Sequence, residues 1–290
     1  MNDLKRNGSG YYDPTAYAGM KSVVKCENES DRKAAECAAR VCFSVAQKRP
    51  DSSVILPTGR SATILFRAML RVAAEYDDCP FGDATLISDT ETFGVWREHD
   101  SSRTRHIYEM LINPLKRVKK EPSDEQIQLL SGIYTDSDPV KKAQKTIRMF
   151  PPSIHLIAVA PTGEILAYEV GTYDEADEII DDAPCIVEVG EHSRRYIDPN
   201  QPSKSIVSIG LGTSLAADLL IILIFDIKKA NILNRMLKGP PTSGIPATLL
   251  RKHPHAFIIT TKNVAQEANI ENFVIPMKNS KEGEEWILSK

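Results

Sequence analysis

The sequence predicts an α/β protein with a doubly wound, mostly parallel sheet that carries helices on both faces. Short apolar runs alternate with amphipathic helical patterns almost throughout the chain, which is typical of a parallel sheet with crossover helices. The run at 219–225 is apolar throughout, as expected of a central strand with both faces covered. With 290 residues, 42% of them hydrophobic and 26% charged, the chain can form one large core or two modest ones.

The first half of the chain opens with a polar segment, 1–30, which is interrupted by glycine and proline and predicts an irregular lead-in. Residues 31–290 are predicted to form a single domain. Apolar residues at helical spacing predict helices from Asp31, over 61–74 and through 107–111. The remaining predictions for this half are strands at 54–56 and 84–88 and a long polar loop at 89–102.

The second half of the chain continues the alternation. Asp138-Pro139 predicts a helix start, because proline is favoured at the first helical position. A helix over 230–237 is predicted to stop at Gly239-Pro240. Strands are predicted at 126–130, 154–159, 165–170, 206–209, 219–225, 256–260 and, as an edge strand, 273–276.

Charge and cysteine content argue against several classes of function. The net charge of −3 gives no bulk attraction for nucleic acid. The five cysteines are irregularly spaced and form no C-x-x-C pair. This pattern argues against a zinc site, and it fits a protein of the reducing cytoplasm. No signal-peptide pattern occurs, and the longest apolar run, 215–227, contains Asp218 and Asp226 and is too short to cross a bilayer. We therefore expect a cytoplasmic protein with neither a nucleic-acid nor a membrane partner.

The segment 56–62, Leu-Pro-Thr-Gly-Arg-Ser-Ala, joins the strand 54–56 to the helix 61–74. Such a loop presents free backbone N–H groups and the positive end of a helix dipole, which favour a phosphate or another anion. Gly59 permits close approach to the backbone, and Ser61 can cap the helix or donate its hydroxyl to a ligand. Arg60 can add a charge-assisted contact. The pattern is also typical of an ordinary strand-to-helix turn, so both interpretations stay open.

Loops that follow strands are predicted to converge on one crevice, because ligands of open parallel sheets bind beyond the carboxyl ends of the strands. These loops are 57–61, 89–103, 160–164 and 210–214. The second loop contains Asp89 and Glu91, and Glu164 and Glu169 flank the strand predicted after the third. Carboxylates that face a pocket are suited to moving protons between carbons and oxygens, although each is also compatible with a solvated surface.

Two further motifs predict structure rather than chemistry. Gly210-Leu211-Gly212-Thr213-Ser214 has only part of a dinucleotide fingerprint and predicts a backbone turn. His253-Pro254-His255 lacks an evident third metal ligand, so two packed or exposed imidazoles are expected and no metal is assigned.

Taken in order, these segments resemble the glucosamine-6-phosphate deaminase (isomerase) and 6-phosphogluconolactonase superfamily over residues 31–265. The matching segments are Leu56–Gly59, Thr90–Gly94 with Glu98, His99 and Ser102, Pro161–Ile165 with Glu169, Ser193-Arg194, Ile209–Thr213, Lys229-Ala230 with Gly239-Pro240, and His253-Pro254. The resemblance rests on these segments occurring in the same order as in the family. It implies the Rossmann-like fold of the glucosamine-6-phosphate and ribose-5-phosphate isomerases.

The resemblance also implies a phosphate site and a type of reaction. The phosphate site would consist of Thr58, Gly59, Ser61, Arg194 and Lys229. The family's chemistry is proton transfer and water addition, so no metal or organic cofactor is expected. Self-association is common in the family, and a homo-oligomer stays open here.

The residues that transfer protons in the family are replaced in this chain. Thr90 stands where the deaminases carry the aspartate that moves a proton between C1 and C2, and Glu164 stands where they carry a histidine that assists ring opening. A threonine hydroxyl is too weak an acid and base to substitute for a carboxylate, and acid–base steps contribute ~10²–10⁴-fold. Catalysis would therefore use Asp89 or Glu91 as the base and Glu164 or Glu169 as the acid.

We expect a protein that acts on a phosphorylated sugar or aminosugar by carboxylate-mediated proton transfer, as an isomerase or deaminase. Two alternatives stay open within the resemblance: a non-catalytic sugar-phosphate sensor or pseudoenzyme, and a 6-phosphogluconolactonase-like hydrolase. A third alternative is a macromolecular binding partner that only reuses the fold, since a fold alone does not fix function.

Overall fold

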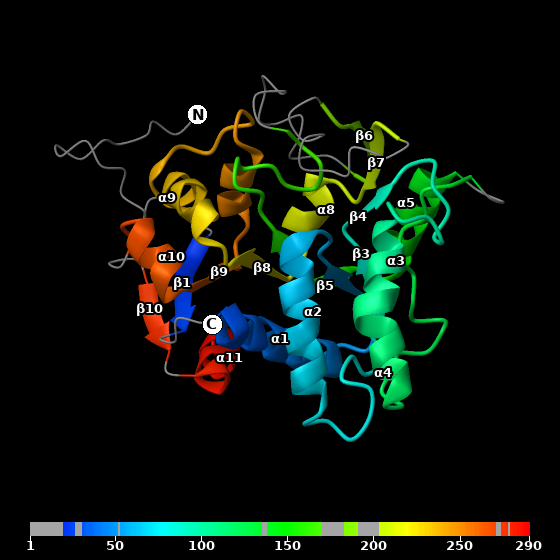
Figure 1. The fold of residues 1–290 in the computed structure, drawn as a ribbon, viewed down its shortest axis with the longest axis horizontal. Coiled ribbons are helices and arrows are strands. Elements are labelled where there is room, and N and C mark those ends of the chain that lie inside the picture. The colour runs from blue at the N-terminus through cyan, green and yellow to red at the C-terminus, as the bar shows by residue number, and fades with distance from the viewer. Residues whose placement is uncertain are drawn as a thin grey trace.

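The computed structural model of the chain describes residues 20–26, 31–51, 53–134, 138–169, 183–190, 203–270, 274–277 and 279–290. These residues form a larger sheet with helices around it and a smaller sheet at the edge of the molecule (Figure 1). The strands are β1 Met20–Cys26, β2 Ser53–Leu56, β3 Thr85–Ser88, β4 Thr90–Thr92, β5 Pro152–Ala158, β6 Cys185–Glu188, β7 Ser205–Ser208, β8 Leu219–Ile224, β9 Ala256–Thr261 and β10 Val274–Met277. The helices are α1 Asp31–Lys48, α2 Arg60–Ala73, α3 Arg103–Ile107, η2 Tyr108–Ile112, α4 Asn113–Arg117, α5 Pro139–Met149, α8 Leu211–Leu215, η3 Ile227–Lys229, α9 Ala230–Lys238, η4 Pro246–Lys252, α10 Lys262–Glu267 and α11 Ser280–Leu288.

The larger sheet has seven strands in the order β10-β1-β9-β8-β5-β2-β3, and all its pairs are parallel. This confirms the predicted α/β class. The apolar strand β8 is the fourth of the seven, and five of its six residues are buried, as its sequence predicts. Val274–Met277 forms the edge strand β10, close to the predicted range.

Alternate residues of the strands contribute to two hydrophobic cores on opposite faces of the sheet. In β2, Val54 and Leu56 pack in the core that contains residues of α1, α2 and α11. Ile55, between them, packs in the core that contains residues of α9 and α10. Successive side chains of a strand point to opposite faces, so both faces of this sheet are covered. This arrangement is the predicted doubly wound one.

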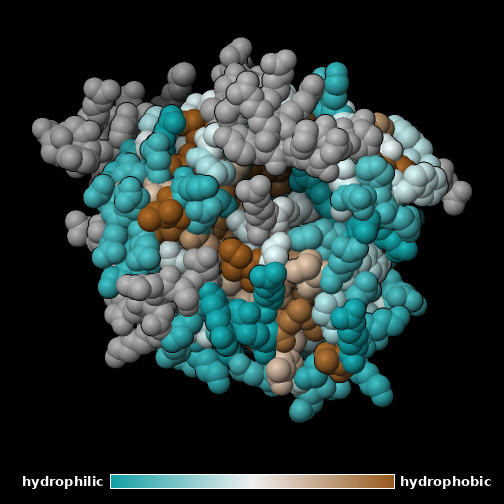
Figure 2. Space-filling view, in the orientation of Figure 1, coloured by the Kyte–Doolittle hydropathy of each residue, from teal (hydrophilic) through white to brown (hydrophobic). Residues whose placement is uncertain are grey.

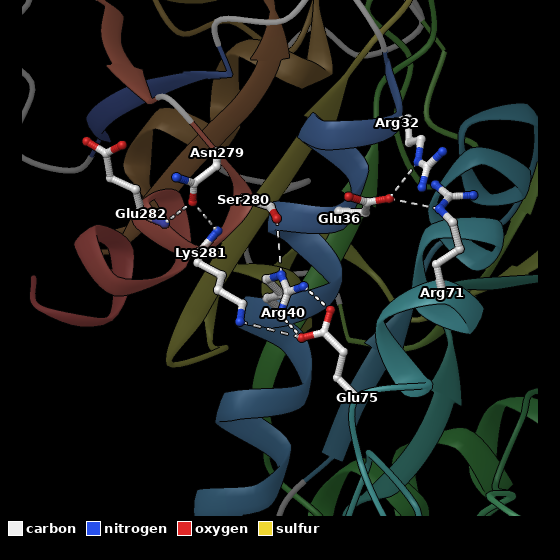
Figure 3. A network of polar contacts seen from close by, with 9 residues as sticks. All are labelled: Arg32, Glu36, Arg40, Arg71, Glu75, Asn279, Ser280, Lys281 and Glu282. Carbon is white, nitrogen blue, oxygen red and sulfur yellow. Dashed lines mark hydrogen bonds and ion pairs between the residues drawn. The ribbon is translucent and has the colours of Figure 1, made fainter.

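Polar contacts join α1 to α2 and to α11, which is close to the end of the chain (Figure 3). Arg40 of α1 donates to Ser280 Oγ of α11 at 3.1 Å and forms an ion pair with Glu75, just after α2. Glu36, one turn earlier in α1, accepts from Arg71 Nε of α2 at 2.8 Å. The helices on this face are thus connected by paired charges as well as by the core.

The predicted lead-in differs from the structure at its end. Residues 20–26 form strand β1, which lies between β9 and β10 in the larger sheet. The rest of the segment 1–30 lies outside the described residues. The sequence of β1, Met-Lys-Ser-Val-Val-Lys-Cys, does not alternate strictly between apolar and polar residues, and pairing with neighbours on both sides gives it strand geometry that its pattern alone does not indicate.

Two predicted strands are wrong in detail. Instead of a strand at 165–170, Ile165 and Tyr168 form an isolated bridge around Leu166 and Ala167, whose positive φ angles of 53° and 72° make a tight turn; Val170 lies outside the described residues. The predicted strand 126–130 is reduced to one bridge at Ile127. Short apolar runs do not distinguish a strand from a buried turn.

The predicted polar loop 89–102 contains strand β4, which pairs with β7 in a separate antiparallel sheet of order β4-β7-β6. The predicted strand at 206–209 therefore exists as β7, but it lies outside the larger sheet. Hydrophilic side chains dominate the face seen in Figure 2, with hydrophobic residues in small groups between them. Among the described helices, none combines the length and apolar character needed to cross a membrane.

Candidate functional site

A cavity of about 530 Å³ lies at the carboxyl ends of β8, β5, β2 and β3, which are neighbours in the larger sheet. Its size is in the range of roughly 300–1,000 Å³ typical of small-molecule sites. Strand β2 has β3 on one side and β5 on the other, so the cavity opens where the order of the strands changes direction. Ligands of open α/β sheets bind at such a point.

Three of the four predicted loops line this cavity. They are 57–61, 89–103 and 160–164. The loop 210–214 is not part of the described lining, because it follows β7 of the smaller sheet. Gly210 has a φ of 80° immediately before α8, in agreement with the predicted backbone turn. The segment 225–229, after β8, takes the fourth place in the lining.

The loop between β2 and α2 forms one wall. Gly59 precedes α2 with a φ of 87°, a conformation that favours glycine. No described side chain caps α2. The Ala62 N–H donates to the Gly59 carbonyl oxygen at 3.1 Å, so the N–H groups of Arg60 and Ser61 are the first-turn donors left for an anion. Capping of this helix was one of the two roles predicted for Ser61. The Ser61 hydroxyl instead accepts a hydrogen bond from Lys229 Nζ at 2.7 Å.

Lys229 is buried and lines the cavity from the segment after β8. Burial lowers the pKa of its ammonium group to about 8, and the nearby Asp226 counteracts part of that effect. An anion bound beside Lys229 would replace the lost hydration of the ammonium group and favour its charged form. Lys229, Ser61 and the start of α2 thus lie together at one end of the cavity, as a candidate anion site.

Two predicted phosphate ligands cannot be placed. Arg194 and the side chain of Arg60 lie outside the described residues. Both stay predictions.

Asp89 follows β3 and is buried at the second wall. Its Oδ1 atom accepts hydrogen bonds from the hydroxyls of Thr58, at 2.9 Å, and Thr90, at 3.0 Å. Burial raises the pKa of Asp89 to about 6, and the Thr58 hydroxyl and the charge of Arg103 reduce the extent of that rise. A carboxyl group with such a pKa can both accept and return a proton near neutral pH.

Arg103 completes this wall, and the sequence reasoning did not find it. Its Nη1 atom donates to Thr58 Oγ1 at 3.1 Å and to Thr90 Oγ1 at 2.8 Å, the same two hydroxyls that bind Asp89. Arg103 is the first residue of α3. A cation at the positive end of a helix is unfavourable, and this placement was the available signal for a functional role.

Glu91 has a different environment from Asp89. Its carboxylate accepts from the Ser102 hydroxyl at 2.9 Å and from the backbone N–H groups of Arg103 and Thr104 at 2.9 and 2.8 Å. It is buried and is not among the described residues that line the cavity. Glu91 therefore holds the start of α3, and through it the backbone of Arg103, in place.

The loop after β5 brings Glu164 to the cavity but not Glu169. Glu164 and Thr162 are half-buried in the lining. Glu169 is buried outside the described lining, with its carboxylate packed close to Gly190. Of the four predicted catalytic carboxylates, Asp89 and Glu164 thus share the cavity, whereas Glu91 and Glu169 are buried outside its described lining.

The predicted histidine pair divides between core and surface. His253 is buried, its Nε2 atom lies 2.7 Å from the Ala217 carbonyl oxygen, and its Nδ1 atom accepts from the backbone N–H of His255. His255 itself is exposed. His253 therefore fixes a turn, as one of the two predicted roles implied.

No protein-family model matches the chain. Over 214 residues it is 26% identical to the glucosamine-6-phosphate deaminase of Streptococcus pyogenes serotype M1, a match that covers 73% of this chain and 86% of the relative. Over 250 residues it is 25% identical to the glucosamine-6-phosphate deaminase of Streptococcus uberis, with 84% of this chain and 98% of the relative covered.

Solved structures are similar over most of the chain. One is a monomeric glucosamine-6-phosphate deaminase, with a TM-score of 0.71 and 18% identity, covering 85% of this chain and all of the other. Another is 6-phosphogluconolactonase from Trypanosoma brucei, with a TM-score of 0.66 and 12% identity, covering 85% and 98%. The chain thus has the α/β fold of the glucosamine-6-phosphate deaminase and 6-phosphogluconolactonase superfamily. Its sequence similarity is a weak but consistent homology to the glucosamine-6-phosphate deaminases, in agreement with the predicted resemblance.

Proposed function

We propose that the cavity binds a phosphorylated sugar and that the chain moves a proton on that sugar, as isomerases and deaminases do. The observation that carries the proposal is the presence, in one cavity, of the hydrogen-bonded pair Lys229 and Ser61 at the start of α2 and of the buried carboxylate Asp89. The relatives described above are glucosamine-6-phosphate deaminases, and their names support a phosphorylated sugar or aminosugar as the substrate class.

In this proposal the phosphate lies at the start of α2. The N–H groups around Gly59 and Ser61 donate to its oxygens, and Lys229, which is hydrogen-bonded to the Ser61 hydroxyl, supplies a positive charge. Arg60 and Arg194 are proposed to add two further charges. A group with nearly two negative charges matches such a site better than a neutral group does.

The reacting carbons are proposed to lie beside Asp89. Because the pKa of Asp89 is about 6, its carboxylate is mostly ionised at neutral pH and still basic enough to remove a proton from a carbon next to a carbonyl group and return it to the adjacent carbon. Glu164, in the same cavity, is proposed as the acid that protonates a sugar oxygen. Glu91 and Glu169 would support the site without touching the substrate.

Thr90 gives a second candidate, a sugar-phosphate sensor without catalysis. It stands where the deaminases it resembles carry their proton-transferring aspartate, and its hydroxyl is bonded to Asp89 and Arg103. Binding of sugar phosphates without isomerisation, ammonia release or hydrolysis would favour the sensor over the enzyme.

The phosphate site is tested by Lys229→Met. We expect it to weaken the binding of glucose 6-phosphate by about tenfold or more, because a hydrogen bond to a charged group contributes roughly 1.5–3 kcal/mol. Titration calorimetry at neutral pH measures this loss, and inorganic phosphate should compete for the site. In the wild type, the affinity should decrease above about pH 8 as Lys229 loses its proton.

Lys238→Met is a matched control for this variant. Lys238 ends α9, and its Nζ atom donates to the Asn269 carbonyl oxygen at 2.9 Å, away from the cavity lining. Equal affinities for the wild type, Lys229→Met and Lys238→Met would contradict the proposed anion site.

A further inference from the structure

Arg103 is connected to Asp89 through two buried hydroxyl groups. Its Nη1 atom donates to Thr58 Oγ1 at 3.1 Å and to Thr90 Oγ1 at 2.8 Å. Both hydroxyls are within hydrogen-bond distance of the same carboxylate oxygen, Asp89 Oδ1, at 2.9 and 3.0 Å, and their oxygens lie 2.6 Å from each other. The guanidinium group is therefore one hydroxyl away from the carboxylate that the proposed function makes the base.

The donors of Arg103 determine where the hydroxyl hydrogens point. A guanidinium group donates hydrogen bonds and cannot accept them, so Thr58 and Thr90 must both accept from Nη1. The single hydrogen of each hydroxyl then points to Asp89 Oδ1 or to the other threonine. In every such arrangement at least one hydroxyl donates to Oδ1, so Arg103 directs the two threonines toward the carboxylate.

The charge of Arg103 acts in the same direction as these hydrogen bonds. Burial raises the pKa of Asp89, and the Thr58 hydroxyl, the charge of Arg103 and the Thr90 hydroxyl each lower it, with a result of about 6. Asp89, and after it Glu91, in turn favour the charged form of the guanidinium group, whose pKa burial lowers. Besides Asp89, the charged residues in the described lining are Asp100, Arg103, Glu164, Asp226, Lys228 and Lys229. Arg103 is thus the cation that is linked by hydrogen bonds to Asp89.

The two oxygens of the Asp89 carboxylate differ in their surroundings. Both hydroxyl contacts end at Oδ1, and no hydroxyl of the described residues donates to Oδ2. Asp89 lines the cavity, and a carboxylate oxygen without a hydroxyl donor has the capacity to accept a proton from a bound molecule. The hydrogen bonds at Oδ1 also restrict rotation of the carboxylate, which gives Oδ2 a fixed position.

We propose that Arg103 is a positioning residue for proton transfer: through the hydroxyls of Thr58 and Thr90 it keeps the Asp89 carboxylate ionised and oriented so that Oδ2 takes the proton. The inference rests on the proposed function, which makes Asp89 the base. Arg103 itself does not touch the reacting atoms in this proposal. Its hydrogen bonds hold the base in place before the substrate binds, which is how supporting residues contribute to a catalytic site.

The proposed transfer returns both carboxyl groups to their starting states. Oδ2 of Asp89 takes the proton from the carbon next to the carbonyl group, and the electron pair of that C–H bond forms a carbon–carbon double bond while Glu164 protonates the carbonyl oxygen. The proton on Oδ2 then passes to the adjacent carbon. Glu164 regains a proton from the second oxygen of the enediol, so a sugar phosphate is isomerised without a further reactant.

The pKa of Asp89 tests the inference directly. It is measured by NMR titration of the carboxyl carbons of isotope-labelled aspartate, with Asp89→Asn to identify the signal. We expect about 6 in the wild type and a value higher by about one unit or more in Arg103→Met, because an opposite charge within ~4–6 Å lowers a carboxyl pKa by about 1–3 units. Thr90→Val, which replaces only the hydroxyl, should also raise the pKa.

The double variant shows whether Arg103 acts through the hydroxyls. In the Thr90→Val background, Arg103→Met should raise the pKa of Asp89 by less than it does alone, because one of its two hydroxyl links is already lost. Arg105→Gln is the matched control: Arg105 is also in α3, pairs with Asp100 and Glu109 and is outside the described lining, so the pKa of Asp89 should not change.

Three results would overturn the inference. One is an unchanged pKa of Asp89 in Arg103→Met. Another is an exactly additive pair of increases, which would mean that Arg103 acts by charge alone and not through the hydroxyls. The third is an unchanged pKa in Thr90→Val, a measurement that stays decisive if Arg103→Met does not fold.

Turnover separates this inference from the proposed function. If the wild type isomerises glucose 6-phosphate or releases ammonia from glucosamine 6-phosphate, the acid limb of its pH–rate profile should move upward in Arg103→Met by as much as the pKa of Asp89 does. A limb that stays in place while the pKa moves would overturn the role of Arg103 in proton transfer. If the wild type turns over neither sugar phosphate and the pKa still depends on Arg103, the proposed function fails while the control of Asp89 by Arg103 stands.

Discussion

Asp89 and Glu91 are two residues apart and have different roles because of what surrounds them. Asp89 accepts hydrogen bonds from two hydroxyls at the cavity, and burial raises its pKa to about 6. Glu91 accepts two backbone N–H groups from the start of α3 and the Ser102 hydroxyl. A carboxylate that accepts hydrogen bonds from the N–H groups at a helix start stabilises the structure. A buried carboxylate that has only hydroxyl donors can instead gain and release a proton near neutral pH.

Asp89→Asn should stabilise the protein while removing any proton transfer. Since the fold raises the pKa of Asp89 from 3.8 to about 6, the native state binds a proton in this interval that the unfolded state does not, and stability decreases as pH rises through it. Above about pH 6 the ionised form therefore costs stability, by up to about 3 kcal/mol at about 1.4 kcal/mol per pKa unit. We expect a higher free energy of unfolding in urea at about pH 7.5, together with loss of turnover.

The exposed Asp83 provides the control for that variant. Asp83→Asn should change the free energy of unfolding by less than about 0.5 kcal/mol. Destabilisation by Asp89→Asn at neutral pH would show that the ionised carboxylate contributes more to the fold than its burial costs.

At the scale of elements, the loop after β5 depends on one glycine. Gly163 has a φ of 106°, and a Cβ atom there would lie 2.6 Å from Ile245 Cγ2 and 2.8 Å from Ile232 Cδ1. Its carbonyl oxygen accepts from the backbone N–H of Ala247 at 2.9 Å. The loop that carries Glu164 to the cavity is thus packed directly against the core, and its shape requires a residue without a side chain.

Gly163→Ala should destabilise the protein more than Gly94→Ala does. Gly94 also has a positive φ, 81°, but a Cβ atom there would meet nothing within 4 Å. The alanine at 94 carries the backbone strain alone, of roughly 1–2 kcal/mol, and the alanine at 163 adds overpacking of about 1–3 kcal/mol. Urea unfolding of both variants measures the difference, and equal losses would mean that Ile245 and Ile232 move aside freely.

At the scale of the whole molecule, an imidazole is buried within the larger sheet. His155 of β5 is fully buried, and neither ring nitrogen has a hydrogen-bond partner in the part of the chain that the structure describes. Burial lowers the pKa of His155 to about 3, and His253 adds to the effect. The unfolded chain can protonate this side chain, but the packed sheet cannot accommodate the charge. His155 therefore lowers the free energy of unfolding at acidic pH.

His155→Leu should therefore gain stability relative to the wild type as the pH falls. The unfolded chain binds a proton at His155 below about pH 6.5 and the folded chain does not until about pH 3, so the difference in unfolding free energy should grow by about 1.4 kcal/mol per pH unit below about 6. The comparison with the wild type matters, because Asp89 contributes with the opposite sign in the same interval. Urea unfolding between about pH 7 and 5 measures the trend.

The exposed His255 gives the control, since His255→Gln should show no such trend. A difference between the wild type and His155→Leu that does not change with pH would mean that the ring reaches a partner or water in solution.

The sequence by itself determined the features that depend on neighbouring residues. The apolar run of β8 predicted a central strand, Asp138-Pro139 predicted the start of α5, whose first N–H groups Asp138 caps, and Gly59 predicted the turn before α2. Each is a local preference of backbone or side chain, so a short window contains its cause. The motif order also predicted the superfamily that the comparisons support.

Only the tertiary structure decided which of these residues meet. Lys229 reaches Ser61 across 168 positions, Arg103 and Asp89 meet through hydroxyls from two loops, and β1 becomes an inner strand through its partners. Local patterns state that a side chain is charged or apolar, but burial, pKa and free donors depend on atoms supplied by distant segments. The chemistry of the cavity therefore depends on how the sheet packs, whereas most strands of the sheet could be predicted from the sequence.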